Sequence, residues 1–319
     1  MHEFELIKKY FSKLAKKNKN SLELNDDVFF DRSKKLVVSV DTYVEGIHFL
    51  NFKKPNLVIK KILRSSISDL ICKGVEPKYY FISGSGNKKS FSKINLSKIS
   101  RSLKEEQRKY SIFLCGGDTV FSNKLSFTIT SIGFSNKIIF RNKAKLNDDI
   151  YVTGNLGDSF IGLKLLKKKI SLNNRLNKYF INKYYLPDLQ TNISKKLLSF
   201  ANTSIDISDG LLTDLEKLIN DQKYSYKLFL KDIPISKNLK NLIDLKKYKK
   251  ISCISNGDDY QILFTANPSK SRIILKTCKL LGIKISKIGK ICPHYQKSQI
   301  IDEKNKKITL KSKGYYHKF

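Results

Sequence analysis

Aspartates gather in short polar motifs of this sequence, although Lys and Arg together exceed Asp and Glu by 34 residues. The stretch IDISDGLLTDL, residues 205–215, contains three aspartates in eleven residues. Others stand in NDD, VDT, SDL, GGDT and GDDY, each at the expected end of a strand or start of a helix. The acids at such positions are Asp26, Asp27, Asp41, Asp69, Asp118, Asp206, Asp209, Asp258 and Asp259.

Carboxylates that a fold brings together repel one another unless cations share them. Mg²⁺ is a hard cation that accepts carboxylate oxygens together with phosphate oxygens. The pattern therefore predicts a nucleotide site that binds several Mg²⁺ ions. A single aspartate taken alone more often caps a helix or stabilises a turn, and we expect this of Asp148, Asp149 and Asp214.

The usual nucleotide-binding and hydrolase motifs are missing from the sequence. There is no G-x-x-x-x-G-K-[ST], and GSGNKK, residues 84–89, lacks the third glycine of a dinucleotide fingerprint. No Ser-His-Asp arrangement stands out, and His48 is the only histidine inside an acid-bearing segment. A nucleotide site without a P-loop must hold its nucleotide through metal ions and backbone amides.

Hydrophobic periodicity predicts the elements that position these acids in an α/β fold. We expect helices at residues 4–15, 55–74 and 95–109, and strands at 35–44, 111–119 and 124–134. Strand-to-helix alternation restarts at residues 150–169, so the sequence predicts two domains, residues 1–145 and 146–319. In the second we expect a helix at 193–202, a strand at 260–266 and a βαβ-like segment at 269–292.

Composition narrows the class of protein. With 319 residues and 40% hydrophobic content, the chain can bury a core. The net charge of +34 suggests nucleic-acid binding. However, only seven of the 62 basic residues are Arg, and the lysines are scattered along the chain. This distribution favours lysines on solvated surfaces over a specific basic binding site. The cysteines show no metal-ligand spacing, and no apolar run reaches membrane-spanning length, so we expect a cytoplasmic protein without membrane segments.

The ordered motifs resemble those of the thiamine-monophosphate kinase family, within the aminoimidazole-ribonucleotide-synthetase-like ATP-binding superfamily. HEFELIKKYF is similar to G-E-F-x-L-I-x-x-x-F, NDD to G-D-D, and SVDTYVEGIHF to S-T-D-x-x-V-x-x-x-H-F. SISDLICKGVEP resembles N-x-S-D-x-x-A-M-G-x-x-P, CGGDT resembles G-G-D-T, and VTGNLGDSFIGL resembles V-T-G-x-L-G-x-S-x-x-G-L. IDISDGLLTDL is nearly identical to D-x-S-D-G-L-x-x-D-L, NGDDYQILF resembles G-G-E-D-Y-E-L-x-F, and KGYYHKF resembles G-[YF]-x-H-F.

This resemblance, which is nearly full length, implies ATP-dependent phosphorylation of thiamine monophosphate to thiamine diphosphate by direct in-line transfer, the last step of thiamine diphosphate synthesis. It also implies a homodimer whose N-terminal α/β domains pair their sheets into a barrel, with the C-terminal α/β domain covering the ATP site. Its co-substrate would be ATP, its cofactor Mg²⁺ and its substrate thiamine monophosphate.

The resemblance implies binding roles for the positions of this sequence that match the family's motifs. Metal-binding positions are Asp27, Ser39, Asp41, Asp69, Asp118, Asp206 and Asp209. ATP-binding positions are Gly117, Asp118, Arg141 and Ser208, and substrate positions are His48, Asp258 and Tyr315. Gly116 and Gly117 also suit close approach to phosphates, because they lack a Cβ.

Several positions depart from the family pattern, and other readings stay open. Asn25 replaces a glycine, Val40 a threonine and Ser66 an asparagine, while Asp258 stands where the family has glutamate. LPDLQ, residues 186–190, lacks the family's arginines. The alternatives are a selenophosphate or aminoimidazole-ribonucleotide synthetase, a hydrogenase-maturation protein, or a basic nucleic-acid binder. The reactive N-terminal or C-terminal Cys of two of these relatives is missing here, since the first cysteine is Cys72 and the chain ends GYYHKF.

Overall fold

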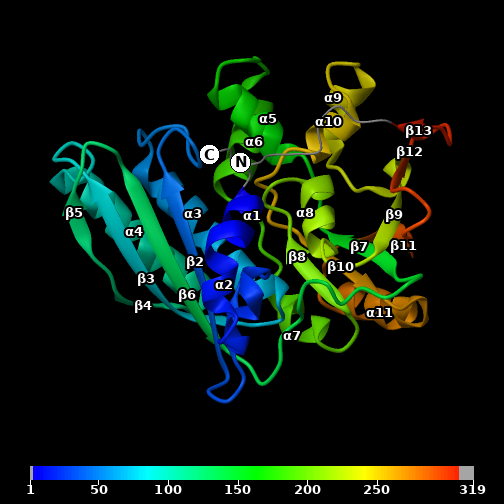
Figure 1. The fold of residues 1–319 in the computed structure, drawn as a ribbon. Coiled ribbons are helices and arrows are strands. Elements are labelled where there is room, and N and C mark those ends of the chain that lie inside the picture. Colours follow the sequence, from blue (N-terminus) through cyan, green and yellow to red (C-terminus); the bar gives the residue numbers. More distant parts are fainter. Residues whose placement is uncertain (1–2, 309–319) are drawn as a thin grey trace.

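Two β-sheets organise the chain, one in each half of the sequence (Figure 1). The computed structural model describes residues 3–308. The helices of the first half are α1 (Glu3–Leu6), a π-helical turn (Ile7–Phe11), α2 (Ser12–Ala15), a 3₁₀ segment (Lys19–Leu24), α3 (Pro55–Cys72) and α4 (Lys93–Tyr110). Its strands are β1 (Phe29–Asp31), β2 (Leu36–Val44), β3 (Pro77–Gly86), β4 (Phe113–Gly116), β5 (Thr119–Phe121) and β6 (Ser126–Phe134).

The second half repeats the mixture of strands and helices. Its strands are β7 (Asp149–Thr153), β8 (Thr203–Asp206), β9 (Tyr224–Phe229), β10 (Ile262–Ala266), β11 (Ile285–Pro293), β12 (Gln299–Ile301) and β13 (Lys307–Ile308). Its α-helices are α5 (Asp158–Leu166), α6 (Asn174–Tyr185), α7 (Ser194–Leu197), α8 (Leu211–Leu218), α9 (Lys237–Asp244), α10 (Lys250–Ile254) and α11 (Ser271–Leu280). Short 3₁₀ turns lie at Thr191–Ile193, Leu230–Asp232 and Pro268–Lys270.

The first sheet has the order β1-β2-β6-β3-β4, with β5 also paired to β3. Strand β6 is antiparallel to both β2 and β3, whereas β4 and β5 run parallel to β3. Side chains alternate between the two faces of a strand. On β2, Val37, Ser39 and Tyr43 are buried while Val40 is exposed, so Asp41 shares the inner face with Ser39 and Tyr43.

Helix α3 connects the two halves. Its interior is almost entirely buried, and it packs against β2, β6 and α4 in the first half and against β8 and α6 in the second. It begins with Pro55 in its first turn and ends before Gly74, whose φ of +81° a residue with a Cβ adopts only with strain. Asp69, near the end of α3, therefore lies where both sheets approach.

The second sheet has the order β13-β12-β9-β11-β7-β10-β8 and is mostly antiparallel. Strand β7 lies between β10 and β11, so the expected βαβ-like segment is a split unit in which β10-α11-β11 crosses over one strand. One hydrophobic core takes residues from both halves, including Ile62, Tyr80 and Phe264. A second core, with Leu212 and Ile288, lies under α8.

One face of the first sheet exposes large apolar side chains. They are Val40 on β2, Phe134 on β6, Tyr79 and Phe81 on β3, Phe113 on β4 and Val120 on β5. Helices α3 and α4 lie on the other face (Figure 1). Within residues 3–308, no helix combines the length and apolar character that crossing a membrane requires.

Most predicted elements are confirmed, and the mixed α/β class is correct. The strand expected at 111–119 divides into β4 and β5 around Gly117, and the helix expected at 193–202 shortens to α7. The sheets change between β6 and β7, where we place the boundary between the proposed domains. The division at residues 145 and 146 stays a prediction.

Candidate active site

Three elements bring carboxylates together: β2 contributes the half-buried Asp41, α3 the half-buried Asp69, and the end of β8 the buried Asp206. The Ser39 hydroxyl donates a hydrogen bond to Asp69 Oδ2 at 2.5 Å, and the Tyr43 hydroxyl donates to Asp41 Oδ2 at 3.0 Å. Strand alternation explains the pairing, since Ser39, Asp41 and Tyr43 share the face of β2 that packs on α3.

The carboxylates of this cluster oppose one another's ionisation. Burial, with the negative charge of Asp27, raises the pKa of Asp41 to about 6 and that of Asp206 to about 7. Burial together with the charges of Asp41 and Asp206 holds the pKa of Asp69 well above its usual value. Raised carboxylate pKa values of this origin indicate a site that favours an additional cation.

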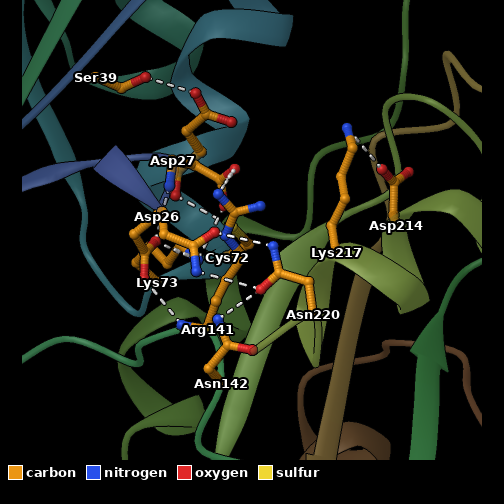
Figure 2. A network of polar contacts seen from close by, with 12 residues as sticks. Asp26, Asp27, Ser39, Cys72, Lys73, Arg141, Asn142, Asp214, Lys217 and Asn220 are labelled. Carbon is orange, nitrogen blue, oxygen red and sulfur yellow. Dashed lines mark hydrogen bonds and ion pairs between the residues drawn. The ribbon is translucent and has the colours of Figure 1, made fainter. Parts of the chain in front are cut away.

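Two cations of the chain already meet the acids at one side of the cluster. The Lys73 ammonium, which is wholly buried, lies 2.7 Å from Asp26 Oδ1 and 3.0 Å from Asp27 Oδ2, and it donates to the Ser204 carbonyl at 2.9 Å (Figure 2). An Arg141 guanidinium nitrogen lies 3.6 Å from Asp27 Oδ1. Burial disfavours the charged form of Asp27, but Arg141 and Lys73 outweigh it and hold its pKa well below the usual range.

The loop after β8 places Asp209 beside the cluster. Asp214, in the first turn of α8, accepts hydrogen bonds from the backbone N–H groups of Asp209 and Gly210 at 2.9 and 3.0 Å. Lys217 pairs with both Asp209 and Asp214. The expectation that Asp214 stabilises a helix start is therefore confirmed. Asp148 likewise acts in a turn, because it accepts a hydrogen bond from the Lys145 N–H at 2.9 Å.

The predicted substrate residues His48 and Asp258 face the junction of the two halves. Asp258 pairs with Lys61 of α3, and the Tyr184 hydroxyl of α6 donates to the His48 carbonyl at 3.4 Å. The Asp258 N–H donates to the Ser208 carbonyl at 2.8 Å, so the GDDY loop rests on the loop that holds Asp209. Tyr315 lies outside the described residues.

Gly117 and Asp118 are exposed and lie apart from the buried cluster within this chain. Strands β6 and β3 separate β2, which holds Asp41, from β4 and β5, between which Asp118 lies. Two intervening strands correspond to roughly 14 Å at the usual strand spacing. Gly117 has a local reason to be glycine, because a Cβ there would meet the Ile82 carbonyl oxygen of β3 at 1.8 Å.

The donor set suits Mg²⁺ in its chemistry. The cluster offers carboxylate and hydroxyl oxygens without thiolate or imidazole ligands, as hard divalent cations prefer. Asp206 Oδ2 is buried and lacks a hydrogen-bond partner within the described part of the chain. As the side chains stand, however, no three His, Cys, Asp or Glu residues within 3–308 converge on one point that could hold a metal ion. Several oxygens are instead bonded to Ser39, Tyr43, Lys73 and Lys217.

Sequence reasoning missed the lysines that pair with the acids. Lys61, Lys73 and Lys217 are inconspicuous among the many lysines of the chain. One signal could have revealed the first two: both interrupt the otherwise apolar inner pattern of LVIKKILRSSISDLICKG, residues 57–74. A lysine on the buried face of a helix needs a carboxylate or carbonyl partner.

Comparisons with known proteins agree with the fold and with the order of motifs. The family model of the N-terminal domain of AIR synthase related proteins matches residues 25–135. A thiamine-monophosphate kinase from Buchnera aphidicola subsp. Acyrthosiphon pisum is 37% identical to the chain, and the match covers 99% of this chain and 98% of the relative. A thiamine-monophosphate kinase from Haemophilus influenzae is 31% identical, and the match again covers 99% of this chain and 98% of the relative.

A solved structure is also similar over nearly the whole chain. It is described as AaThiL complexed with AMPPCP and TMP, and it is 26% identical in sequence with a TM-score of 0.84. The match covers 99% of this chain and 97% of that one. The two folds therefore agree across both sheets.

Proposed function

The chain belongs to the thiamine-monophosphate kinase family, and we propose that it transfers the γ-phosphate of ATP to thiamine monophosphate, giving thiamine diphosphate and ADP. The observation that carries this proposal is the match of the whole chain, in sequence and fold, to relatives of that name and to a structure in complex with AMPPCP and TMP. Because ATP is a cytoplasmic co-substrate, we place the reaction in the cytoplasm.

We assign the buried acids to Mg²⁺. Asp27, Ser39, Asp41, Asp69, Asp206 and Asp209 would hold the ions, and bound Mg²⁺ would neutralise the charge of the triphosphate. The raised pKa values of Asp41 and Asp206 support this assignment, since a cation would offset the burial and the repulsion by Asp27 that raise them. Asp118, which is exposed, would bind a separate Mg²⁺ ion or one that arrives bound to ATP. The hydrogen bond from Ser39 to Asp69 is compatible with this role, because the hydroxyl oxygen keeps its lone pairs for an ion.

The remaining residues would position the two substrates. Arg141, Ser208 and the backbone at Gly117 are assigned to the ATP phosphates, and His48 and Asp258 to the thiamine phosphate. No residue here needs to become covalently modified, because direct phosphoryl transfer depends mainly on alignment and on charge neutralisation. The hydrogen bond between the Asp258 N–H and the Ser208 carbonyl supports this assignment, because it brings the proposed substrate loop next to the proposed ATP loop.

We also propose that the chain acts as a homodimer. The exposed apolar side chains on β2, β3, β4, β5 and β6 lie on one face of one sheet, and apolar residues gathered in this way typically mark an interaction surface. Pairing this face with that of a second copy would cover Phe113, Phe134 and Tyr79. It would also cover the parallel edge formed by β4 and β5.

The proposed reaction is tested by incubating the purified protein with ATP, Mg²⁺ and thiamine monophosphate and measuring thiamine diphosphate by chromatography. Parallel reactions omit Mg²⁺ or replace the monophosphate with free thiamine. We expect product only in the complete reaction. Product from free thiamine, or none from the monophosphate while ATP still binds, would move the chain to another reaction of the superfamily.

A further inference from the structure

Lys61 is a buried cation that no step of the proposed reaction uses. Its residue is 1% exposed, on the inner face of α3. Its ammonium pairs with Asp258, lies 4.1 Å from the centre of the Tyr184 ring and 5.5 Å from that of Tyr260, and is 3.4 Å from the Tyr184 carbonyl oxygen. Aromatic faces and a carboxylate are favourable neighbours for an ammonium that has lost its water.

Within the described residues, the hydrogen bonds found to the Asp258 carboxylate are all on one oxygen. Lys61 and the Tyr260 hydroxyl, at 3.1 Å, both donate to Oδ1. Within the described residues no hydrogen bond to Oδ2 is found, and the Asp258 side chain is 27% exposed, whereas that of Lys61 is 2% exposed. The carboxylate is thus held from its buried side by Lys61 and keeps one oxygen available on its solvent side.

The backbone around Asp258 has a conformation that residues other than glycine seldom adopt. Asp258 has φ +66° and Tyr260 has φ +50°, both in the left-handed region. Their N–H groups donate to the carbonyls of Ser208 and Ile207, each at 2.8 Å. These bonds fix the loop to the segment that follows β8, and Lys61 fixes the carboxylate to α3, which belongs to the first half.

Lys61 also contacts Tyr184, which in turn contacts His48, the other assigned substrate residue. Tyr184, over whose ring the Lys61 ammonium lies, donates its hydroxyl to the His48 carbonyl at 3.4 Å. His48 in turn packs edge-on against Tyr43, whose hydroxyl donates to Asp41. Lys61 therefore lies between the two assigned substrate residues, in contact with one and linked to the other through one tyrosine.

We propose that Lys61 is a positioning residue for the thiamine phosphate. Its ammonium fixes Oδ1 of Asp258 so that Oδ2 points toward the substrate, and it holds Tyr184 in place beneath His48. This inference rests on the proposed function, because it takes Asp258 and His48 as substrate contacts. It concerns substrate binding rather than the transfer itself, so its effect should fall on the KM for thiamine monophosphate.

The neighbouring lysine offers a matched control. Lys60 also lies on α3 and also pairs with an acid, Glu105, but that pair is at the surface with 19% and 42% of the two side chains exposed. We expect Lys61→Met to raise the KM for thiamine monophosphate at least tenfold, with the KM for ATP changed less than twofold. Lys60→Met should leave both constants unchanged. A KM for thiamine monophosphate within twofold of wild type in Lys61→Met overturns the proposal.

A double-mutant cycle separates positioning from a general loss of structure. If Lys61 acts in part through Asp258, adding Lys61→Met to Asp258→Asn raises the KM for thiamine monophosphate by a smaller factor than Lys61→Met does alone. Fully additive effects contradict the proposal, as does a general fall in kcat with both KM values unchanged. Should Lys61→Met fold poorly, the double variant, which buries neither charge alone, still yields the comparison with Asp258→Asn. Lack of turnover by the wild-type protein would refute the proposed function, whereas active wild type with an unaffected Lys61→Met refutes this inference alone.

Discussion

The backbone N–H of Asp258 donates to the carbonyl of Ser208 at 2.8 Å, which joins two loops that lie fifty residues apart in the sequence. Ser208 stands between Asp206 and Asp209, which we assign to metal binding, and Asp258 is assigned to the substrate. The contact means that the proposed metal and substrate residues of the second half form one packed unit.

The first prediction concerns Gly257, at this contact. A Cβ at Gly257 would lie 1.6 Å from the Ser208 carbonyl oxygen, so Gly257→Ala must separate the two loops. We expect a loss of most turnover and a destabilisation of about 1–3 kcal/mol, typical of overpacking. Gly282→Ala is the control, because a Cβ there meets nothing within 4 Å although its φ is +65°. Equal kcat values for the two variants would show that the contact does not position the site.

The second prediction concerns the buried ammonium of Lys73. Replacing it with methionine leaves Asp26 and Asp27 without their nearest cation, and removing one partner of a buried ion pair typically costs about 3–5 kcal/mol. We expect Lys73→Met to lower the free energy of unfolding by that amount in urea denaturation. Lys78→Met, at an exposed lysine five residues later, should change it by less than about 0.5 kcal/mol. Equal stabilities would contradict the structural role of Lys73.

The third prediction separates catalysis from stability at Asp118. Its side chain is exposed, so Asp118→Asn should leave the melting temperature unchanged while abolishing turnover, because the variant loses a charge assigned to the metal and phosphates. Glu76→Gln, which removes an acid from a surface pair with Lys195, controls for loss of charge alone. Wild-type kcat in Asp118→Asn would remove this residue from the site.

The fourth prediction is a pH dependence from Asp259. Burial raises the pKa of this carboxyl to about 8, although the Gly157 N–H and the Ser159 hydroxyl donate to it. Its pKa in the unfolded chain is near 4, so between about pH 4 and 8 the folded state keeps a proton that the unfolded state has lost. The stability from this proton is complete below about pH 4 and is lost as the pH rises through about 8.

Asp259→Asn removes that titration and therefore isolates it. We expect the free energy of unfolding of the wild type, minus that of the variant, to decrease from about pH 5 to about pH 8 in urea titrations. A difference that stays constant over the same range would mean that Asp259 is already ionised in the folded protein. Thermal melts at the same pH values provide an independent measure.

The fifth prediction tests the dimer. Phe113 is 60% exposed on β4, and a glutamate there would place a charge in the proposed interface. We expect Phe113→Glu to be monomeric in analytical ultracentrifugation under conditions where the wild type is dimeric. Tyr295→Glu changes an 83% exposed aromatic residue outside the first sheet and should leave the dimer intact. A monomeric wild type would reject the interface.

Local sequence patterns predicted most long elements because their signals are strong. Helix α3 has an apolar pattern, Pro55 at its start and Gly74 just beyond its end, and β2 and β6 alternate clearly. Strand β3 was not predicted, since Pro77 and the glycines of GSG obscure its pattern, although Tyr79, Tyr80 and Phe81 favour a strand. The short strands β1 and β9 carry too few residues for a periodic signal.

The acidic residues of the site could be predicted from the sequence, but the lysines that pair with them could not. Motif order identified Asp41, Asp69 and Asp206, which the fold brings together. No local signal shows that Lys73 reaches Asp26 or that Lys61 reaches Asp258, because these pairs depend on how α3 packs against segments far away in the sequence. For the same reason the sequence could not show that β6 and β3 separate Asp118 from Asp41.

The central claim is direct phosphoryl transfer from ATP to thiamine monophosphate, and ³¹P NMR of one reaction mixture tests it most directly. With ATP, Mg²⁺, thiamine monophosphate and the wild-type protein, we predict that the γ-phosphate signal of ATP falls while those of ADP and thiamine diphosphate rise in equal amounts. Inorganic phosphate should stay at the level of a reaction without protein. Formation of inorganic phosphate in step with ADP, without thiamine diphosphate, would contradict the account and indicate a synthetase or a hydrolase.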